Sequence, residues 1–138
     1  MLIKANIDIP ETLSIFRAEG LQVSFIVPTE TGLKKSIMDA TESFREFLFN
    51  TGIHNYDKQN QGTANKKIVE TVLISKDNFF QTKTSLYRPE TKNGDPRIWV
   101  YELSKHASQG DLLAFLSAKD KLIVINCSNC NLQGLIKT

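Results

Sequence analysis

The 138-residue sequence is poor in the residues that build metal centres and disulfide frameworks, since it has only two cysteines and two histidines. A structural zinc site needs four ligands. Cys127 and Cys130 have no second cysteine pair, and His54 and His106 lie far from them in the sequence. The pair also does not follow a strand and begin a helix, as a thioredoxin-like motif does. We therefore expect reduced, inert thiols and no metal or cofactor.

Long apolar runs and a strong net charge are also absent. No run approaches the ~20 apolar residues of a membrane span, and the N-terminus lacks the basic-then-apolar pattern of a signal peptide. The formal net charge is +2, so any contact with nucleic acid must come from a local cluster of cations. These features predict one cytoplasmic domain over residues 1–138 that makes no membrane contact. Its core is expected at about residues 20–126, followed by a tail at residues 127–138.

Familiar catalytic motifs are missing as well. The sequence has no Gly-rich phosphate loop, His-Glu-x-x-His helix or nucleophile elbow. Asp95, Glu102 and Lys105 imitate the two carboxylates and lysine of metal-dependent nucleases. In that arrangement, however, the second carboxylate and the lysine lie two residues apart on one strand. Glu102 and Lys105 are three apart, which favours an exposed pair on one helix face.

Apolar spacing predicts mostly strands. Residues 21–28 alternate apolar and polar side chains and end in a proline, as a half-buried strand does. After a loop at residues 29–35, the spacing becomes helical, with Ser36 as N-cap and Gly52 just past the helix end. A long polar loop is expected at residues 53–67. Further strands are expected at residues 68–74, 79–86, 97–101, 111–116 and 121–126, with a short helix at residues 102–107.

This order of elements predicts a mainly β fold with one or two helices, of the α+β class, most economically a small open barrel. Strands and helices do not alternate regularly, which disfavours a doubly wound nucleotide-binding sheet.

Charged and turn-forming residues are concentrated at residues 85–99. The segment holds three cations, three residues with carboxylate or amide groups, and one tryptophan: Arg88, Lys92, Arg97, Glu90, Asn93, Asp95 and Trp99. Cations neutralise phosphates, and the forked groups of Arg, Asn, Glu and Asp match base edges in the major groove. The alternative is a solvated hairpin loop, because turns favour Asn, Gly, Asp and Pro.

Individual roles within this segment follow from side-chain chemistry. Either Arg88 or Arg97 can bind a guanine through two hydrogen bonds, while Glu90 or Asp95 accepts from a cytosine amino group or orients an arginine. Orienting an arginine is the role expected for Asp95. Trp99 shares a strand with apolar residues, so it is either a core residue or an exposed stacking surface.

A second, smaller cluster of cations follows the first predicted strand. Lys34 and Lys35 are adjacent, so from a loop both can reach phosphates, whereas on a regular strand they would face opposite ways. The alternative is a solvated lysine pair.

Two segments together resemble a known family. They are Thr31-Gly32-Leu33-Lys34-Lys35, between a strand and a helix, and Leu86-Tyr87-Arg88-Pro89 through Gly94-Asp95-Pro96-Arg97-Ile98-Trp99. The chain, over roughly residues 20–126, resembles the DNA-binding effector domain of EcoRII-like type IIE restriction endonucleases. That domain is a DNA-binding pseudobarrel of the class also found in plant transcription factors.

The resemblance implies an open pseudobarrel of about seven strands whose two arms grip the major groove of DNA. Here the early arm is residues 29–36 and the late arm is residues 88–99. Lys34 and Lys35 stand where the family's early arm carries a histidine, so base readout by that arm is in doubt. The family keeps its catalytic residues in a separate domain.

We therefore expect sequence-specific binding of duplex DNA with a short target site, and no catalytic activity in this chain. It would act as the effector or targeting domain of an endonuclease in a prokaryotic restriction-modification system, with the catalytic nuclease domain elsewhere in the full-length protein. A small metal-dependent nuclease and a protein-interaction domain are the alternatives. The candidate DNA-binding residues are Lys34, Lys35, Ser36, Arg88, Glu90, Lys92, Asn93, Asp95, Arg97 and Trp99.

Overall fold

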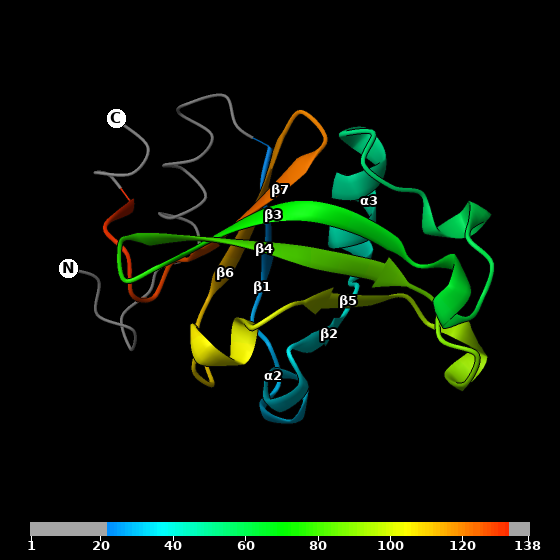
Figure 1. Ribbon diagram of the computed structural model, residues 1–138, viewed down its shortest axis with the longest axis horizontal. Helices are drawn as coiled ribbons and strands as arrows, with labels where there is room; N and C mark the ends of the chain where they lie inside the picture. Colours follow the sequence, from blue (N-terminus) through cyan, green and yellow to red (C-terminus); the bar gives the residue numbers. More distant parts are fainter. Residues whose placement is uncertain (1–21, 133–138) are drawn as a thin grey trace.

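A computed structural model describes residues 22–132 of the chain. In these residues, seven strands form one curled sheet in the order β1-β6-β7-β3-β4-β5-β2 (Figure 1). The strands are β1 (Ser24–Ile26), β2 (Ile37–Asp39), β3 (Lys67–Ser75), β4 (Asn78–Tyr87), β5 (Arg97–Val100), β6 (Leu113–Ala118) and β7 (Lys121–Asn126). Two α-helices lie wholly within the described residues, α2 (Glu30–Lys35) and α3 (Glu42–Asn50). The predicted mainly β, α+β open pseudobarrel is thus confirmed.

The pairing pattern places strands that follow each other in sequence at opposite edges of the sheet. β1 pairs with β6 and β2 pairs with β5, so β1 and β2 lie at the two edges. All pairs are antiparallel except β3 with β7. β3 and β4 form the longest hairpin, whose two-residue turn has positive φ at Lys76 (52°) and Asp77 (61°). Two such residues match the right-handed twist of the strands they join.

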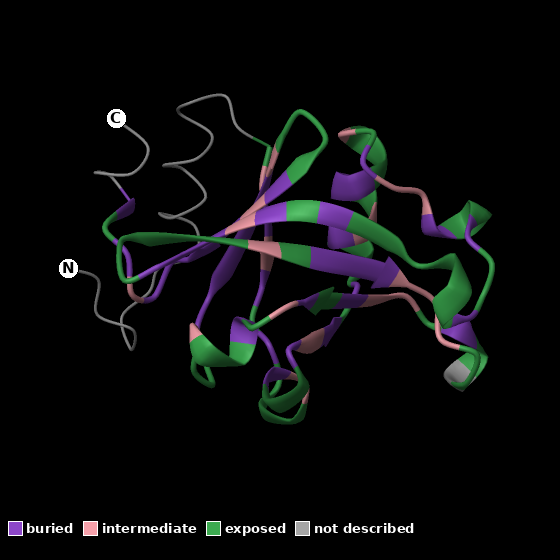
Figure 2. Ribbon diagram, in the orientation of Figure 1, coloured by how far each residue is buried: buried purple, intermediate pink, exposed green. Residues whose placement is uncertain are grey.

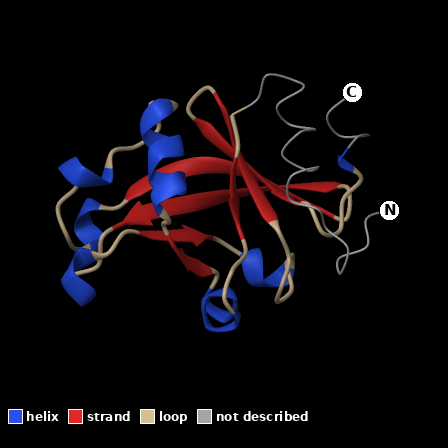
Figure 3. Cartoon of the chain, turned by 180° about the vertical axis from the view of Figure 1, so that it is seen from behind, coloured by secondary structure: helices blue, strands red, loops and turns tan. Residues whose placement is uncertain are grey.

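The apolar core fills the inner side of the curled sheet. Helix α3 lies against this side (Figure 3). There the rings of Phe44 and of Phe115 in β6 meet edge to face, with their centroids 4.9 Å apart. Figure 2 shows buried residues along the strands and exposed residues in the turns. Among residues 22–132, no helix has the length and apolar character needed to cross a lipid bilayer.

Residues 127–132 were expected to belong to a tail, but they pack against the sheet. Cys127, Cys130 and Leu132 are buried in a second apolar cluster with Ile74 and Ile125. The backbone N–H of Cys127 also donates to the carbonyl of Leu112 at 2.8 Å. The tail prediction was wrong for these residues, because burying their apolar side chains and pairing their backbone stabilises the sheet. The described residues do not include residues 133–138 of the expected tail. They also do not include residues 1–21, the last of which is the first residue of the strand expected at 21–28.

The segment after β1 also differs from the prediction. Residues 30–35 form helix α2 and not a loop, with the Thr29 hydroxyl accepting from the backbone N–H of Gly32 at 3.0 Å. Ser36 ends this helix in the left-handed conformation (φ 60°), so it is not the N-cap of the next helix. Residues 37–39 then pair with β5 as β2. Helix α3 begins only after Thr41, whose hydroxyl caps it.

Most of the later predictions hold. The strands expected at residues 68–74, 79–86, 97–101 and 121–126 correspond to β3, β4, β5 and β7, and the strand expected at 111–116 begins two residues later as β6. The polar loop at residues 53–67 contains two 3₁₀ turns, Tyr56–Lys58 and Thr63–Asn65. The helix expected at residues 102–107 is reduced to the 3₁₀ turn Leu103–Lys105.

Candidate nucleic-acid interface

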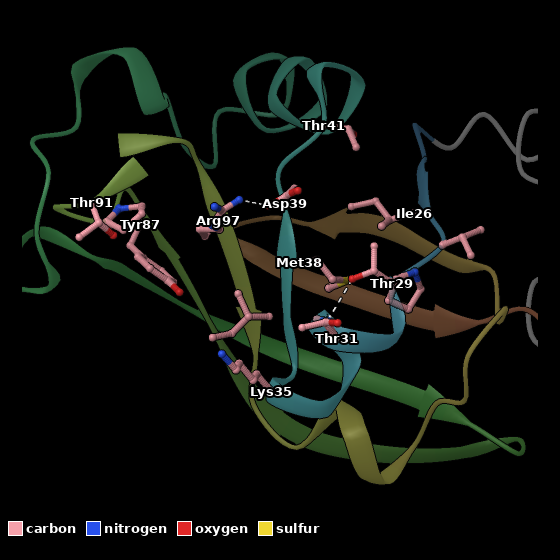
Figure 4. Close-up of a pocket in the computed structure, with 15 residues that line it drawn as sticks. Ile26, Thr29, Thr31, Lys35, Met38, Asp39, Thr41, Tyr87, Thr91 and Arg97 are labelled. Carbon is pink, nitrogen blue, oxygen red and sulfur yellow. Dashed lines mark hydrogen bonds and ion pairs between the residues drawn. The ribbon is translucent and has the colours of Figure 1, made fainter. Parts of the chain in front are cut away.

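A groove of about 580 Å³ separates the early arm from the late arm. Strand β2 runs between the two arms, and residues from all three segments line the groove (Figure 4). The polar and charged lining residues are Thr29, Thr31 and Lys35 from the early arm, Asp39 and Thr41 from β2 and the residues after it, and Tyr87, Thr91 and Arg97 from the late arm and its flanking strand. The fold thus brings two segments some sixty positions apart in the sequence to one groove.

Helix α2 gives the early arm its shape and places its two lysines. Lys34 and Lys35 are exposed in the last turn of the helix, where cations interact favourably with the helix dipole. Lys35 lines the groove, whereas Lys34 is not among the lining residues. The two neighbours are therefore expected to differ in how closely they approach a ligand in the groove.

Ser36, a predicted DNA-binding residue, has an internal structural role. It is buried, and its hydroxyl accepts a hydrogen bond from the backbone N–H of Ser104 at 2.9 Å. Its carbonyl accepts from the N–H of Val100 at 3.1 Å. These contacts join the end of α2 to β5 and to the turn after it, and they leave Ser36 no surface for DNA.

Arg88 holds the late arm in place. Its Nε donates to the carbonyl of Gly94 at 2.9 Å, and its Nη1 donates to the carbonyl of Gln59 at 3.0 Å. The carbonyl of Arg88 accepts from the N–H of Gly62 at 2.7 Å. Arg88 therefore connects the base of the late arm, its tip and the polar loop before β3. Two of its guanidinium nitrogens are engaged within the chain, which gives Arg88 a structural role in the late arm.

The tip of the late arm is a tight turn supported by that polar loop. Asn93 and Gly94 both have positive φ, 58° and 71°. A side chain at Gly94 would collide with Gln61, whose amide donates to the carbonyl of Pro89 at 3.1 Å. The turn exposes Glu90, Asn93 and Asp95. Lys92 lies in the same turn, Lys92–Gly94.

Arg97 forms an ion pair with Asp39, a residue that sequence reasoning missed (Figure 4). The β2–β5 register sets the two residues opposite each other. The Arg97 side chain is 17% exposed and the Asp39 side chain 78%. Within the described residues, Asp95 forms no ion pair. The prediction that Asp95 orients an arginine is therefore not supported by these contacts, and Asp39 is the carboxylate that holds one.

Trp99 belongs to the outer face of β5. The residue is 37% exposed, and the centroid of its ring lies 4.7 Å from that of Tyr101, while Ile98 and Val100 on either side are buried. The strand alternation thus turns Trp99 away from the core. Trp99 is not among the residues that line the groove, but its cross-strand neighbour Ile37 is.

Comparison of the sequence with protein-family models found no match, and searches of curated proteins and of solved structures found none either. The geometry of the groove and its side chains is therefore the basis for assigning a function.

The acidic cluster considered for a nuclease forms a simple surface pair. Lys105 Nζ lies 3.2 Å from Glu102 Oε1, and both side chains are exposed, which confirms the exposed pair expected from their spacing. In residues 22–132, no group of three or more histidine, cysteine or acidic side chains is arranged to hold a metal ion.

The cysteines are free and buried. Burial raises the pKa of the Cys127 thiol to about 12 and also raises the pKa of the Cys130 thiol. A thiol is reactive in its ionised form, so both groups are chemically quiet in the folded protein.

Proposed function

We propose that this chain binds duplex DNA sequence-specifically through the groove between the early and late arms. One observation carries the proposal: two cation-bearing segments, distant in sequence, line a single groove with Lys35 and Arg97 on it. We further propose that the chain is the effector or targeting domain of a restriction endonuclease in the cytoplasm, whose catalytic domain lies elsewhere.

The chemistry of the two arms suits different parts of a duplex. Lys34 and Lys35 are exposed point charges at a helix end and fit phosphates, which supply affinity without sequence information. The late arm presents an amide and two carboxylates at its tip, and Arg97 lies near its base. These groups match the donor and acceptor patterns of the major groove, which is about 12 Å wide and admits such an element.

The small net charge of +2 is consistent with an early arm that contacts phosphates and a late arm that contacts bases. Non-specific affinity rises with the number of phosphates that are neutralised, and a protein with few clustered cations binds random DNA weakly. Preference for a site must then come from base contacts and shape. We expect binding without cleavage, because Glu102 and Lys105 are paired with each other at the surface.

The proposal is tested by selecting bound duplexes from a random pool and measuring affinity for the consensus at several salt concentrations. We expect a short consensus bound at least ~1000-fold more tightly than random duplex, with no cut products in magnesium or manganese. The Lys34→Ala, Lys35→Ala double variant should bind all duplexes more weakly. Its salt slope should be smaller by about one for each phosphate that the lysines no longer neutralise.

Lys121→Ala is the matched control, since Lys121 is exposed at the start of β7 and does not line the groove. One Lys121→Ala change should leave affinity nearly unaltered. The proposal is wrong if wild-type protein binds no duplex at low salt, or if loss of Lys121 weakens binding as much as loss of Lys35. Metal-dependent cleavage that Glu102→Ala abolishes would instead establish the nuclease alternative.

A further inference from the structure

The ion pair between Asp39 and Arg97 joins β2, the strand after the early arm, to the start of β5, at the end of the late arm. We infer that Asp39 is a specificity-determining residue: it orients Arg97, and the two side chains together recognise one C·G base pair. This inference rests on the proposed DNA-binding function.

The backbone on both sides of the pair is fixed by contacts that do not involve the carboxylate. The carbonyl of Arg97 accepts a hydrogen bond from the hydroxyl of buried Tyr56 at 2.9 Å. The N–H of Ala40 donates to the carbonyl of Pro96 at 3.0 Å. Arg45 Nη1 donates to the carbonyl of Ala40 at 2.7 Å. A change at Asp39 therefore acts mainly on the direction of the Arg97 side chain.

At the position of the ion pair, residues on three adjacent strands lie side by side in the sheet. Asp39 of β2 and Tyr87 of β4 are the two cross-strand partners of Arg97, and all three residues line the groove. The Arg97 side chain is mostly covered, whereas Asp39 is mostly exposed. A covered side chain that is already held by a carboxylate loses little conformational freedom when a ligand arrives, so it discriminates well between ligands.

The chemistry of the two groups fits one base pair. A guanidinium has five N–H donors, so an arginine held by one carboxylate keeps donors for a further acceptor. In the major groove guanine presents the O6 and N7 acceptors, and its cytosine partner presents an N4 amino donor. The exposed carboxylate of Asp39 can accept from that amino group while Arg97 donates to the guanine.

This role predicts that a change at Asp39 lowers discrimination between sites without lowering affinity for random duplex. The ion pair has no net charge, so Asp39 opposes the attraction of Arg97 for phosphates. Asp39→Asn removes that opposition and should leave affinity for random duplex unchanged or raise it a few-fold. The same change should reduce discrimination at one C·G pair by about 10-fold or more. A purely structural role would lower affinity for every duplex.

The experiment uses the whole chain and a panel of duplexes in which each base pair of the selected site is replaced in turn. Asp39→Asn should lose discrimination at one position, and Arg97→Lys should lose it at the same position, because lysine lacks the planar fork. The double variant should lose no more than either single variant there. Asp120→Asn is the control: it makes the same charge change at an exposed residue in the turn between β6 and β7, outside both arms and the groove, and should keep the full discrimination profile.

Three results separate the possibilities. If Asp39→Asn retains wild-type discrimination at every position, the inference is wrong and the proposed function stands. If it loses affinity for all duplexes alike, Asp39 is a structural residue and the inference is again wrong. If wild-type protein binds no duplex, the proposed function itself fails. Thermal unfolding of each variant identifies any that is misfolded, and the nearly isosteric asparagine is chosen to keep the fold.

Discussion

Replacing Arg88 with alanine tests whether this residue holds the late arm or reads bases. The substitution removes two hydrogen bonds from a charged donor, to the carbonyls of Gly94 and Gln59. Each such bond is worth about 1.5 to 3 kcal/mol when buried. Because Arg88 is partly exposed, values near the lower limit apply and water replaces part of the loss. We expect the free energy of unfolding to fall by about 2 kcal/mol, which lowers Tm by on the order of 6 °C.

The assay combines urea denaturation, amide hydrogen exchange and DNA binding. Amides at the tip of the late arm, near Gly94, should exchange faster in Arg88→Ala than in wild-type protein. Preference for the selected site should fall at every base pair that the late arm contacts, since the arm is loosened as a whole, while affinity for random duplex should change less. Arg88→Lys should resemble Arg88→Ala, because lysine cannot span both carbonyls with a planar fork.

The opposite result would restore base readout by Arg88. Wild-type stability and wild-type exchange at the tip, together with loss of preference at a single base pair, would show that the two carbonyl contacts do not support the arm.

Three further predictions concern other parts of the chain. Lys35→Ala should weaken duplex binding more than Lys34→Ala in a salt titration, because only Lys35 lines the groove; equal losses would contradict the groove as the binding surface. Burial lowers the pKa of His54 below the usual 6.5, although its hydrogen bond with Gln59 partly opposes this. Below pH 6.5 the unfolded chain therefore binds more protons at His54 than the folded chain, so the free energy of unfolding should fall as pH drops through the folded pKa. In urea titrations between pH 5 and 7, His54→Gln should make the free energy of unfolding less dependent on pH. An unchanged pH dependence in His54→Gln would contradict the lowered pKa of His54. Cys127 should resist a thiol reagent at pH 8 until the protein is unfolded, and rapid labelling of the native state would contradict its burial.

The strands of the sheet were largely predictable because their signals are local. In β3 and β4 the apolar pattern and the turn residues between the strands lie within one stretch of the sequence, and the predicted limits differ from the observed ones by a residue or so. The same holds for β5 and β7. Period-two patterns bounded by turn residues need no information from distant parts of the chain.

The segment from Thr29 to Asp39 was predicted wrongly because its structure depends on short and distant signals. Helix α2 has six residues, too few for a helical repeat to be visible, and its local signal was the cap at Thr29 with an acidic first turn and a basic last turn. Strand β2 has three residues and exists through its pairing with β5, where Ile37 lies opposite Trp99. No periodicity reveals a pairing across sixty residues.

The candidate interface was also predictable only in part. Composition identified both clusters of cations, and Lys35 and Arg97 do line one groove. The partners of the arginines could not be read from composition. Arg88 binds two carbonyls, which every residue carries, and Asp39 faces Arg97 only because of strand register. The charges were visible in the sequence, but their pairing was set by the sheet.

The strand order also determines when the fold can be completed as the chain is synthesised. The β3–β4 hairpin is local and can form early, but β1 has β6 as its partner in the sheet and β3 has β7 as its second neighbour. Pairing such distant strands requires closing long loops first, which makes folding slow. A chain still held at residue 112 on the ribosome has no partner for β1, and Ile26, which lines the groove, is not yet in place. Within the described residues, β7 is the last strand to emerge, and its pairing with β6 and β3 completes the sheet.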